Sequence, residues 1–507
     1  MSDSMVRHRG IITVICIAAT VMQGIDTTIA NIALPHMQGS LSAAQDQIAW
    51  VLTSYLVAGA IVTPMSGWLA SRFGRKRMLF IAIAGFTGAS MLCGASTSLV
   101  QIVLFRLLQG AFGAPLMPMS QSLLLDSTPP EKVGVAMGIW TAGSMVAPIL
   151  GPTLGGWITD HYEWRWVFYI NLPIGILCGL GVLFFVSETR INRKQPFDFF
   201  GFAFLSLAIG AFQMMIDRGE RNDWFSSTEI VVEAALVAGG FWVFLVHSAT
   251  AARPFFSSAL LKDRNLVASI IFVFMTVALI YASMALLPPM LTMLGYPEVA
   301  IGFLLGPRGF ATMAASITAG RLIGRIGPRP LMAVGFFLEA LSFWQMAGFS
   351  PLMGSWPVTV SIFVQGAGIA CLFTPAAATA FSTVPLELRT EASGLFNLSR
   401  NMGSSIGISV AETMLDRMTQ ASHSDLVQNI TPWNPALQQP GISDYWSLDS
   451  VTGLSALDQT INLQAAMIGY IDIFKFMMVA VILLSPLVFI IRPIKRGTAA
   501  PADLAVE

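Results

Sequence analysis

Charged side chains are rare inside the long apolar stretches of this sequence, and those few are the first candidates for chemistry. Asp26 lies in the first stretch and Arg106 in the fourth. Counted along ideal helices, they lie about 12 Å and about 10 Å from the same face, so we expect them to pair. A carboxylate parted from its guanidinium in an apolar interior favours the protonated form, so separating the pair would bind a proton. A permanent ion pair that holds two helices together is the alternative.

Two more carboxylates occur in later apolar stretches. Glu339 lies about 12 Å from the inner end of the eleventh stretch, and Glu412 lies near the outer end of the thirteenth. Either could be a second titrating group or a charge that recognises cations. Glu339 could instead pair with Arg308, which falls at a similar depth in the tenth stretch. We therefore take Asp26, Arg106, Glu339 and Glu412 as candidates for proton coupling or substrate binding.

A short basic segment between the second and third stretches could act as a gate. Gly67 and Gly74 bound a tight turn there, where glycine tolerates backbone conformations that other residues avoid. Cationic side chains in such a turn can bind lipid phosphates or the acidic ends of helices. A role in membrane orientation alone is the alternative. The gating candidates are Gly67, Arg72, Gly74, Arg75 and Lys76.

The fifth stretch is rich in small and helix-breaking residues. Small faces allow helices to pack closely, and prolines allow a helix to bend. A bend would matter in a protein that alternates between conformations, whereas close packing alone is the alternative. The residues concerned are Gly143, Pro148, Gly151, Pro152, Gly155 and Gly156.

The composition indicates which solvent surrounds these residues. Of 507 residues, 11% are charged and 55% are hydrophobic, whereas about 25% of an average soluble protein is charged. Most of the chain must therefore lie in lipid, which excludes a soluble enzyme and a disordered chain. The formal net charge is zero and no basic stripe is present, so a nucleic-acid partner is excluded as well.

The sequence offers no site for a cofactor or a metal. The four cysteines each lie inside an apolar stretch and form no paired motif. No Gly-Lys dipeptide occurs, so the chain has no P-loop for ATP. The five histidines avoid the middle of the apolar stretches, which argues against a membrane-bound enzyme.

The apolar stretches predict an all-helical polytopic membrane protein. A helix of about 20 apolar residues crosses a bilayer, and fourteen stretches qualify; twelve is the rival count, because the seventh and eighth are the weakest. They are residues 11–33, 48–70, 78–97, 99–124, 133–157, 167–187, 199–217, 228–248, 266–292, 299–320, 331–349, 357–384, 393–416 and 470–491.

Positive charges indicate the orientation, because they accumulate in cytoplasmic loops. With the N-terminus inside, 20 of the 28 Lys and Arg residues fall in cytoplasmic segments and four fall in the opposite loops. We therefore expect both termini in the cytoplasm. One long outer loop is expected at residues 417–469.

An internal repeat divides the chain. Residues 67–79 match residues 320–332, and Gln109 with its following glycine matches Gln365 with its own. Parallel repeats of six helices form a transporter architecture whose substrate site lies near the membrane midplane. We expect a six-helix half at 1–190, a two-helix insert with flanking loops at 191–264 and a second six-helix half at 265–507.

These motifs resemble those of the major facilitator superfamily, and within it the fourteen-span drug:proton antiporters of the EmrB/QacA type. The resemblance covers nearly the whole chain. The basic loop departs from the family pattern, because Ser71 stands where an Asp is usual, and this weakens the expected charge relay. The matching segments are Ile25–Pro35, Gly67–Leu79, Arg106–Gly110, Ala147–Gly156 and Trp164–Pro173.

The resemblance implies efflux of hydrophobic or amphipathic compounds in exchange for protons by alternating access. It implies an inner-membrane location, no cofactor beyond the proton gradient, and lipophilic small molecules, protons and membrane lipids as partners. In a host with two membranes it also implies a periplasmic adaptor and an outer-membrane channel, for which the outer loop offers Trp433, Pro435, Pro440 and Trp446. A proton-coupled symporter for a defined nutrient, or a passive channel, is the alternative function.

Overall fold

The computed structural model describes residues 8–129, 132–188, 196–219, 222–252, 254–431, 433–435, 437, 439, 446–448 and 450–491. Within these residues every regular element is a helix. Lipid cannot satisfy backbone N–H and C=O groups, and a helix pairs them within one segment. The predicted all-helical polytopic fold is confirmed.

The first group of helices, which we call the N-terminal half, spans α2 to α12. Prolines interrupt two of its segments, with Pro64 in the short η1 (Thr63–Met65) and Pro115 between α7 and α8. The helices are α2 (Arg9–Ser40), α3 (Gln45–Ile48), α4 (Trp50–Val62), α5 (Ser66–Phe73), α6 (Arg75–Gly94), α7 (Leu99–Gly113), α8 (Leu116–Asp126), α9 (Val133–Ser144), α10 (Val146–His161), α11 (Trp166–Tyr169) and α12 (Asn171–Phe185).

The last group, which we call the C-terminal half, spans α16 to η5. Gly327, with φ +84°, directly follows its α17, and Gly74, with φ +92°, directly follows α5 in the first half. Glycine adopts this backbone conformation readily, so the two sequence repeats make the same turn. The helices are α16 (Arg264–Met293), α17 (Glu298–Ile326), α18 (Pro328–Met346), α19 (Ser355–Ala380), α20 (Arg389–Gln428), α22 (Val451–Leu484) and η5 (Ser485–Ile490).

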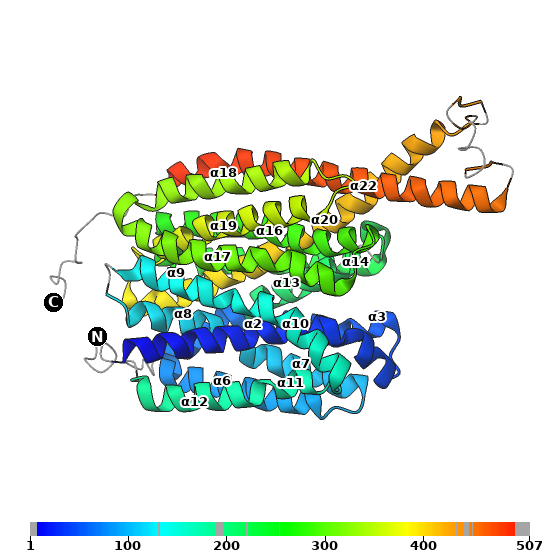
Figure 1. The fold of residues 1–507 in the computed structure, drawn as a ribbon. Helices are drawn as coiled ribbons and strands as arrows, with labels where there is room; N and C mark the ends of the chain where they lie inside the picture. Colours follow the sequence, from blue (N-terminus) through cyan, green and yellow to red (C-terminus); the bar gives the residue numbers. More distant parts are fainter. Residues whose placement is uncertain are drawn as a thin grey trace.

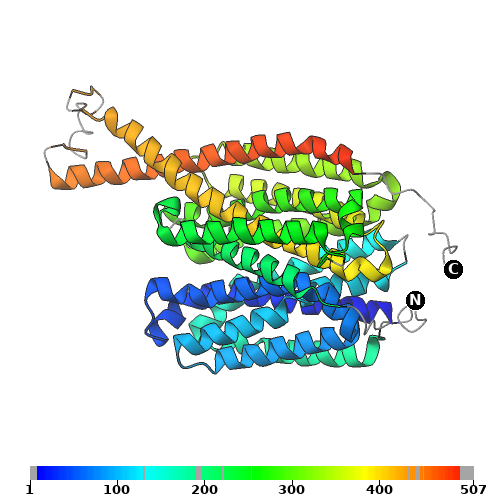
Figure 2. The same ribbon diagram turned by 180° about the vertical axis from the view of Figure 1, so that it is seen from behind.

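Two helices between the halves, α13 (Phe199–Arg218) and α14 (Thr228–Thr250), pack against each other as an insert. Thr53 on α4 donates a hydrogen bond to Asp217 on α13. On the other side, Ser405 on α20 donates to Gln213 on α13 at 3.2 Å. The insert therefore touches both halves, and Figure 2 shows its green helices between the blue N-terminal half and the yellow and orange α20.

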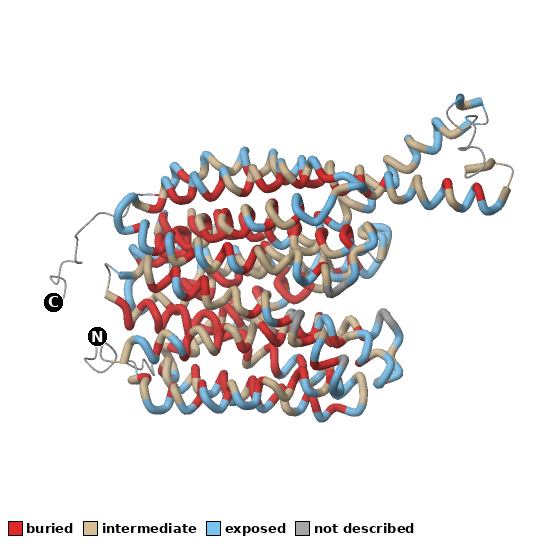
Figure 3. The backbone as a smooth tube through the Cα atoms, viewed as in Figure 1, coloured by how far each residue is buried: buried red, intermediate tan, exposed pale blue. Residues whose placement is uncertain are grey.

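The helices of both halves run roughly parallel to one axis (Figure 1). The start of α2, in dark blue, and the end of α22, in red, lie at the same end of the bundle. We call this the first end and the opposite one the second end. Buried residues concentrate along the inner faces of the helices, and exposed ones lie on the outside (Figure 3). An apolar outer surface is the expected pattern for a bundle that sits in lipid.

Each of the fourteen predicted spans overlaps a long helix. In the described residues, twelve helices are long and apolar enough to cross a membrane by length and composition. The two others, α18 and α20, carry more polar and charged residues but pack into the C-terminal half, against α19 and α16 respectively. The count of fourteen therefore depends on tertiary packing as well as on apolar length.

Residues 417–469, predicted to be a long outer loop, are instead mostly helical in their described part. Helix α20 continues to Gln428 and α22 begins at Val451, so most of this segment is helical. The two helix ends project beyond the second end of the bundle as a hairpin (Figure 1). Membrane thickness limits where apolar residues must stop, but a polar helix can continue into water. Pro440 lies outside the described residues.

Candidate functional site

A buried ion pair lies inside the N-terminal half. Arg106 Nη1 is 2.5 Å from Asp26 Oδ2, and both side chains have an exposed fraction of 0%. Asp26 comes from the middle of α2 and Arg106 from α7. The pairing predicted from the sequence is therefore present. Such a pair is strongly held once formed, because removing one partner leaves an uncompensated charge in an apolar interior.

Two amides complete the environment of Asp26. Gln109 Nε2 donates to Asp26 Oδ1 at 2.8 Å, and Asn171 Nδ2 donates to the same oxygen at 3.0 Å. Asn171 also donates to Ser90 Oγ at 2.9 Å. With these donors and Arg106, both carboxylate oxygens are hydrogen-bonded. This arrangement stabilises an ionised carboxylate.

The local structure explains why these side chains meet. Gln109 follows Arg106 by three residues on α7, so both side chains lie on one face of that helix. Asn171 is the first residue of α12, and this places its side chain beside the middle of α2. In the sequence, Gln109 marks the repeat and belongs to a family segment, and Asn171 belongs to a family segment only; neither was predicted to contact Asp26. The three-residue spacing on α7 was a signal for Gln109, whereas no local pattern pointed to Asn171.

Arg106 is held by three further groups. Its Nε donates to Val51 O at 3.1 Å, its Nη1 donates to Gln109 Oε1 at 2.8 Å, and its guanidinium lies 4.2 Å from the centre of the Tyr55 ring. Its Nη2 atom, although buried, has no hydrogen-bond partner among the described residues. An unsatisfied buried donor costs free energy, so this network is less stable than one in which every donor of Arg106 is paired.

The basic segment contacts the C-terminal half at the first end of the bundle. Arg75 forms an ion pair with Asp126, the last residue of α8, and its Nη2 donates to Leu386 O at 3.1 Å. From the other half, Arg389 Nη1 donates to the same Asp126 at 3.2 Å. One carboxylate therefore binds a cation from each half. Sequence reasoning missed Asp126 and Arg389, which lie at helix ends outside the quoted motifs.

Deeper along the same interface, neutral side chains also join the halves. Ser122 Oγ lies 2.8 Å from Thr390 Oγ1, and Ser393 Oγ donates to Gln121 Oε1 at 2.7 Å. At Gly67, an added Cβ would lie 2.7 Å from the Cα atom of Glu391 on α20. Gly67 is therefore required by close approach of the two halves rather than by an unusual backbone conformation.

The other gating candidates stay within the N-terminal half. Lys76 Nζ donates to Leu183 O at 2.7 Å, and its backbone N–H donates to Glu188 Oε1 at 3.2 Å. Arg72 is half-buried in the last turn of α5. Ser71, which stands at the usual Asp position, donates to Trp68 O at 2.9 Å. The acidic partner of Arg75 is thus Asp126 on another helix.

The glycines of the fifth span bring α9 and α10 against the helix that carries Asp26. The span breaks at Met145, between α9 and α10 and three residues before Pro148. A Cβ at Gly151 would collide with Thr28 Oγ1, one at Gly143 would lie 2.5 Å from Ile17 Cγ2, and one at Gly155 would lie 3.1 Å from Ile29 Cγ1. Gly156 has open space, and the side chain of Pro152 is outside the described ones.

The two C-terminal carboxylates lie apart from the Asp26 network. Glu339 on α18 is buried, with an exposed fraction of 2%, inside the C-terminal half. Neither of its oxygens has a hydrogen-bond partner in the described structure, so the alternative pair with Arg308 is not formed. Glu412, by contrast, is exposed on α20.

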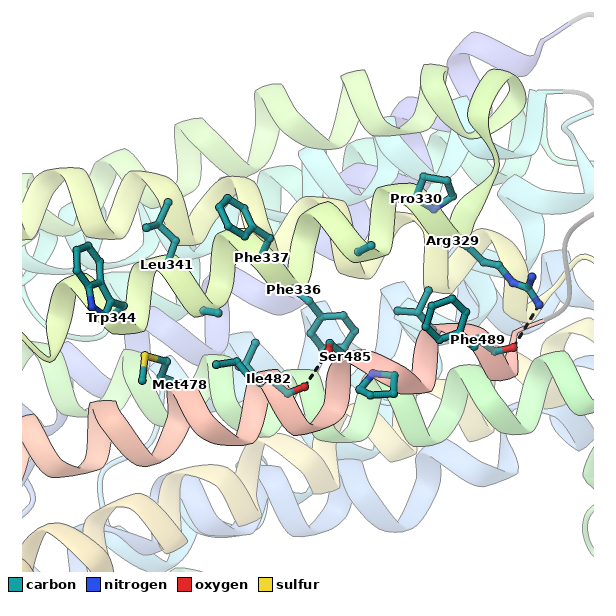
Figure 4. Close-up of a pocket in the computed structure, with 15 residues that line it drawn as sticks. Arg329, Pro330, Phe336, Phe337, Leu341, Trp344, Met478, Ile482, Ser485 and Phe489 are labelled. Carbon is teal, nitrogen blue, oxygen red and sulfur yellow. Dashed lines mark hydrogen bonds between the residues drawn. The ribbon is translucent and has the colours of Figure 1, made fainter.

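An apolar groove of about 760 Å³ lies on the outside of the C-terminal half, between α18 and the end of α22 (Figure 4). Phe337, Trp344 and Phe489 line it and are largely exposed. Arg329 lies at one end, where its Nε donates to Ile491 O at 2.8 Å. The groove lies on the outer surface of the bundle, and none of the proposed coupling residues lines it.

The buried pair predicts an unequal response to single and double substitution. Asp26→Asn should lower the free energy of unfolding by about 3–5 kcal/mol, because Arg106 is left as an uncompensated buried charge. Replacing Arg106 by Met in the same chain should restore much of that loss. Thermal unfolding in detergent measures both. A double variant no more stable than Asp26→Asn alone would contradict the assignment of the loss to charge.

The cluster around Asp126 predicts a second measurable change. In a chain without its four native cysteines, Ser122→Cys places a thiol at the buried interface between the halves. Adding Asp126→Asn should raise its alkylation rate by about tenfold, which corresponds to ~1.4 kcal/mol removed from the closed arrangement. Glu163→Gln, which breaks an exposed pair with Arg165, is the matched control and should leave the rate unchanged. Equal rates in all three chains would show that Asp126 does not hold this end closed.

Comparison with known proteins shows the family to which this chain belongs. The Major Facilitator Superfamily profile matches residues 16–408. The chain is 36% identical over 436 residues to the multidrug export protein EmrB of Escherichia coli K12, covering 84% of each chain. It is 34% identical over 489 residues to the fatty acid resistance protein FarB of Neisseria gonorrhoeae, covering 94% of each.

Solved structures agree on the fold. The human organic anion transporter MFSD10 superimposes with a TM-score of 0.60 at 12% identity, covering 93% of this chain and 99% of that one. The proton:xylose symporter XylE superimposes with a TM-score of 0.57 at 14% identity, covering 93% and 96%. The chain is therefore a multi-pass membrane transporter of the major facilitator superfamily and belongs to the branch that contains EmrB.

Proposed function

We propose that this protein is a secondary efflux transporter that exports hydrophobic or amphipathic compounds in exchange for protons. The observation that carries the proposal is the buried network around Asp26 and Arg106. It holds a carboxylate whose two states, ionised beside a guanidinium or protonated apart from it, differ by one proton. The similarity to export proteins such as EmrB supports the direction and the substrate class.

The contacts of α2 link this proton site to the motion of the halves. Asp26 lies on α2, which packs through Thr28 and Ile29 against Gly151 and Gly155 of α10. Protonation of Asp26 removes its attraction to Arg106, so the conformation with α2 and α7 joined loses stability. A proton that binds one conformation better than the other shifts their populations by that difference in affinity. The fifth-span motif then serves alternating access by transmitting this shift to α10.

The described polar contacts at the first end suit a conformation closed there. Asp126 binds Arg75 and Arg389, and Ser122 lies beside Thr390. We propose that the first end is cytoplasmic, that both termini lie there and that the protein sits in the inner membrane. Substrate release would then occur at the second end. The division into 1–190, 191–264 and 265–507 also remains a proposal.

The chemistry needs no cofactor, because the proton gradient supplies the free energy. Among the described residues no group of three or more His, Cys, Asp or Glu side chains could hold a metal ion. Glu412, exposed on α20, remains a proposed site for cation recognition. Membrane lipids would bind the exposed outer surface.

The test is proton movement in inside-out vesicles energised by respiration, for wild type and Asp26→Asn inserted in equal amounts. Lipophilic cations and anions are added as probes. We expect a probe to dissipate the pH gradient in wild type, and the variant to lose this response at least tenfold. Equal responses would remove Asp26 from the coupling path. Probe uptake driven by the gradient would instead indicate symport, and movement without protons would indicate a channel.

We further propose that the hairpin formed by the projecting ends of α20 and α22 contacts a periplasmic adaptor, which joins an outer-membrane channel. Its position at the second end, beyond the bundle, is the supporting observation (Figure 1). Trp433, exposed near its tip, is a candidate contact. Replacing residues 417–462 by a short flexible linker should abolish co-purification of the host adaptor. The Trp433→Ala variant tests the tip alone. Unchanged co-purification with the linker variant would rule this contact out.

A further inference from the structure

The interior of the C-terminal half repeats the plan of the Asp26 site with a different distribution of charge. Gln365 on α19 donates through Nε2 to Ser283 Oγ on α16 at 2.9 Å. In the N-terminal half, the matching Gln109 donates to Asp26. The hydrogen bond is conserved between the repeats, but a hydroxyl replaces the carboxylate.

A second pair of contacts confirms the correspondence. A Cβ added at Gly110 would collide with Tyr55 O, and one added at Gly366 would collide with Arg308 O. Arg308 therefore occupies the place of Tyr55, the aromatic residue that lies against Arg106. Arg308 lies on the second helix of its half, whereas Arg106 lies on the fourth helix of the N-terminal half.

The carboxylate of this half is Glu339 on α18. A Cβ added at Gly368 of α19 would lie 3.0 Å from Glu339 Oε1, so the carboxyl group packs directly against a neighbouring helix. Neither carboxyl oxygen has a hydrogen-bond partner among the described residues, and neither do Nε and Nη2 of Arg308. The two groups interact electrostatically but form no ion pair.

An ionised carboxylate without hydrogen bonds is strongly disfavoured in an apolar interior, and such a group takes up a proton instead. Asp26 has the opposite environment, with three donors on its two oxygens. One conformation of the protein thus presents a carboxyl group suited to ionisation in one half and a carboxyl group suited to protonation in the other.

We propose that Glu339 holds a proton in this conformation and releases it to water when it pairs with Arg308 in another conformation. Resting on the proposed antiport, this makes Glu339 a second coupling site beside Asp26. The carboxyl O–H bond breaks, the proton leaves, and the guanidinium neutralises the carboxylate. A closing movement of α17 towards α18 would form the pair.

No other charge competes for Glu339 in the part of the chain that the structure describes. Arg308 on α17 is the one charged group that interacts with it, and α19 presents Gln365 and Gly368. On α22, which also packs against α18, Lys475 donates to Asp472 at 3.0 Å and both are exposed. A titration of Glu339 should therefore respond to changes at Arg308 and at the neighbouring Gln365 amide.

The first experiment detects the proton directly in the purified full-length protein. Infrared difference spectra between acidic and alkaline buffers report the C=O stretch of protonated carboxyl groups. We expect a wild-type band that Glu339→Gln lacks and that persists to more alkaline buffer in Arg308→Gln. Asp26→Asn should retain it. A wild-type spectrum unchanged by Glu339→Gln overturns the proposal.

Thermal unfolding separates a proton carrier from a structural ion pair. Gln resembles a protonated Glu in shape and charge, so Glu339→Gln should keep the wild-type melting temperature, whereas Asp26→Asn should lower it. A loss in Glu339→Gln equal to that in Asp26→Asn would mean that Glu339 is ionised and permanently paired, which overturns the proposal.

The third measurement tests the coupling in liposomes, with tetraphenylphosphonium as the probe. We expect Glu339→Gln to lower the number of protons moved per probe by one, with Glu163→Gln, at an exposed pair outside both proposed sites, unchanged as the control. An unchanged ratio in Glu339→Gln overturns its coupling role. If wild-type liposomes move no protons with this probe or with the compounds active in vesicles, the proposed antiport fails, while the infrared spectra still decide whether Glu339 holds a proton.

Discussion

The pairing of Asp26 with Arg106 in an apolar interior is the interaction on which the rest of the N-terminal half depends. Neither charge is stable there alone, so α2 and α7 must meet at one depth and one orientation. The amides of Gln109 and Asn171 then fill the remaining acceptor positions of the carboxylate. Three helices are held together by a group whose charge one proton can cancel.

Under the proposed antiport, this stabilising contact is also the point at which a proton acts. The glycines of α10 allow that helix to pack directly against α2, without intervening side chains. A displacement of α2 would therefore require α10 to move as well. At the first end of the bundle, Asp126 holds cations from both halves. Under the proposed antiport, a proton at Asp26 would act on α2 and α7, whereas the Asp126 cluster joins α6 and α8 of the same half to α20 of the other. Rigid helices of this kind can couple a local charge to a movement of domains.

The two halves share a backbone plan but use it for different electrostatics. The positive-φ glycines, the glutamine hydrogen bonds and the glycine–carbonyl contacts repeat. The charges have moved from the first and fourth helices of one half to the second and third of the other. The insert contacts α4 and α20 and so lies across both halves.

Much of the architecture could be predicted from the sequence. Apolar length specifies helices wherever lipid is the solvent, and the repeat in residues 67–79 and 320–332 predicts two related halves. The depths of Asp26 and Arg106 were predicted from the rise per residue of a helix. Two opposite charges at one depth in an apolar interior are expected to pair, because an unpaired charge there is costly. The helical end of α20 was missed, because membrane thickness says nothing about where a helix stops in water.

The details that depend on helix rotation and on neighbours distant in the chain could not be predicted. Asn171 reaches Asp26, and Asp126 reaches Arg389, only because helices far apart in sequence pack side by side. Glu339 and Arg308 have suitable types and depths for an ion pair, yet their packing keeps them apart. Residue type and depth are carried by the chain itself, so they set which groups can share a layer of the membrane. The rotation of each helix about its axis depends on how all its neighbours pack. This rotation, which the sequence does not reveal, determines which of the charges at one depth form pairs.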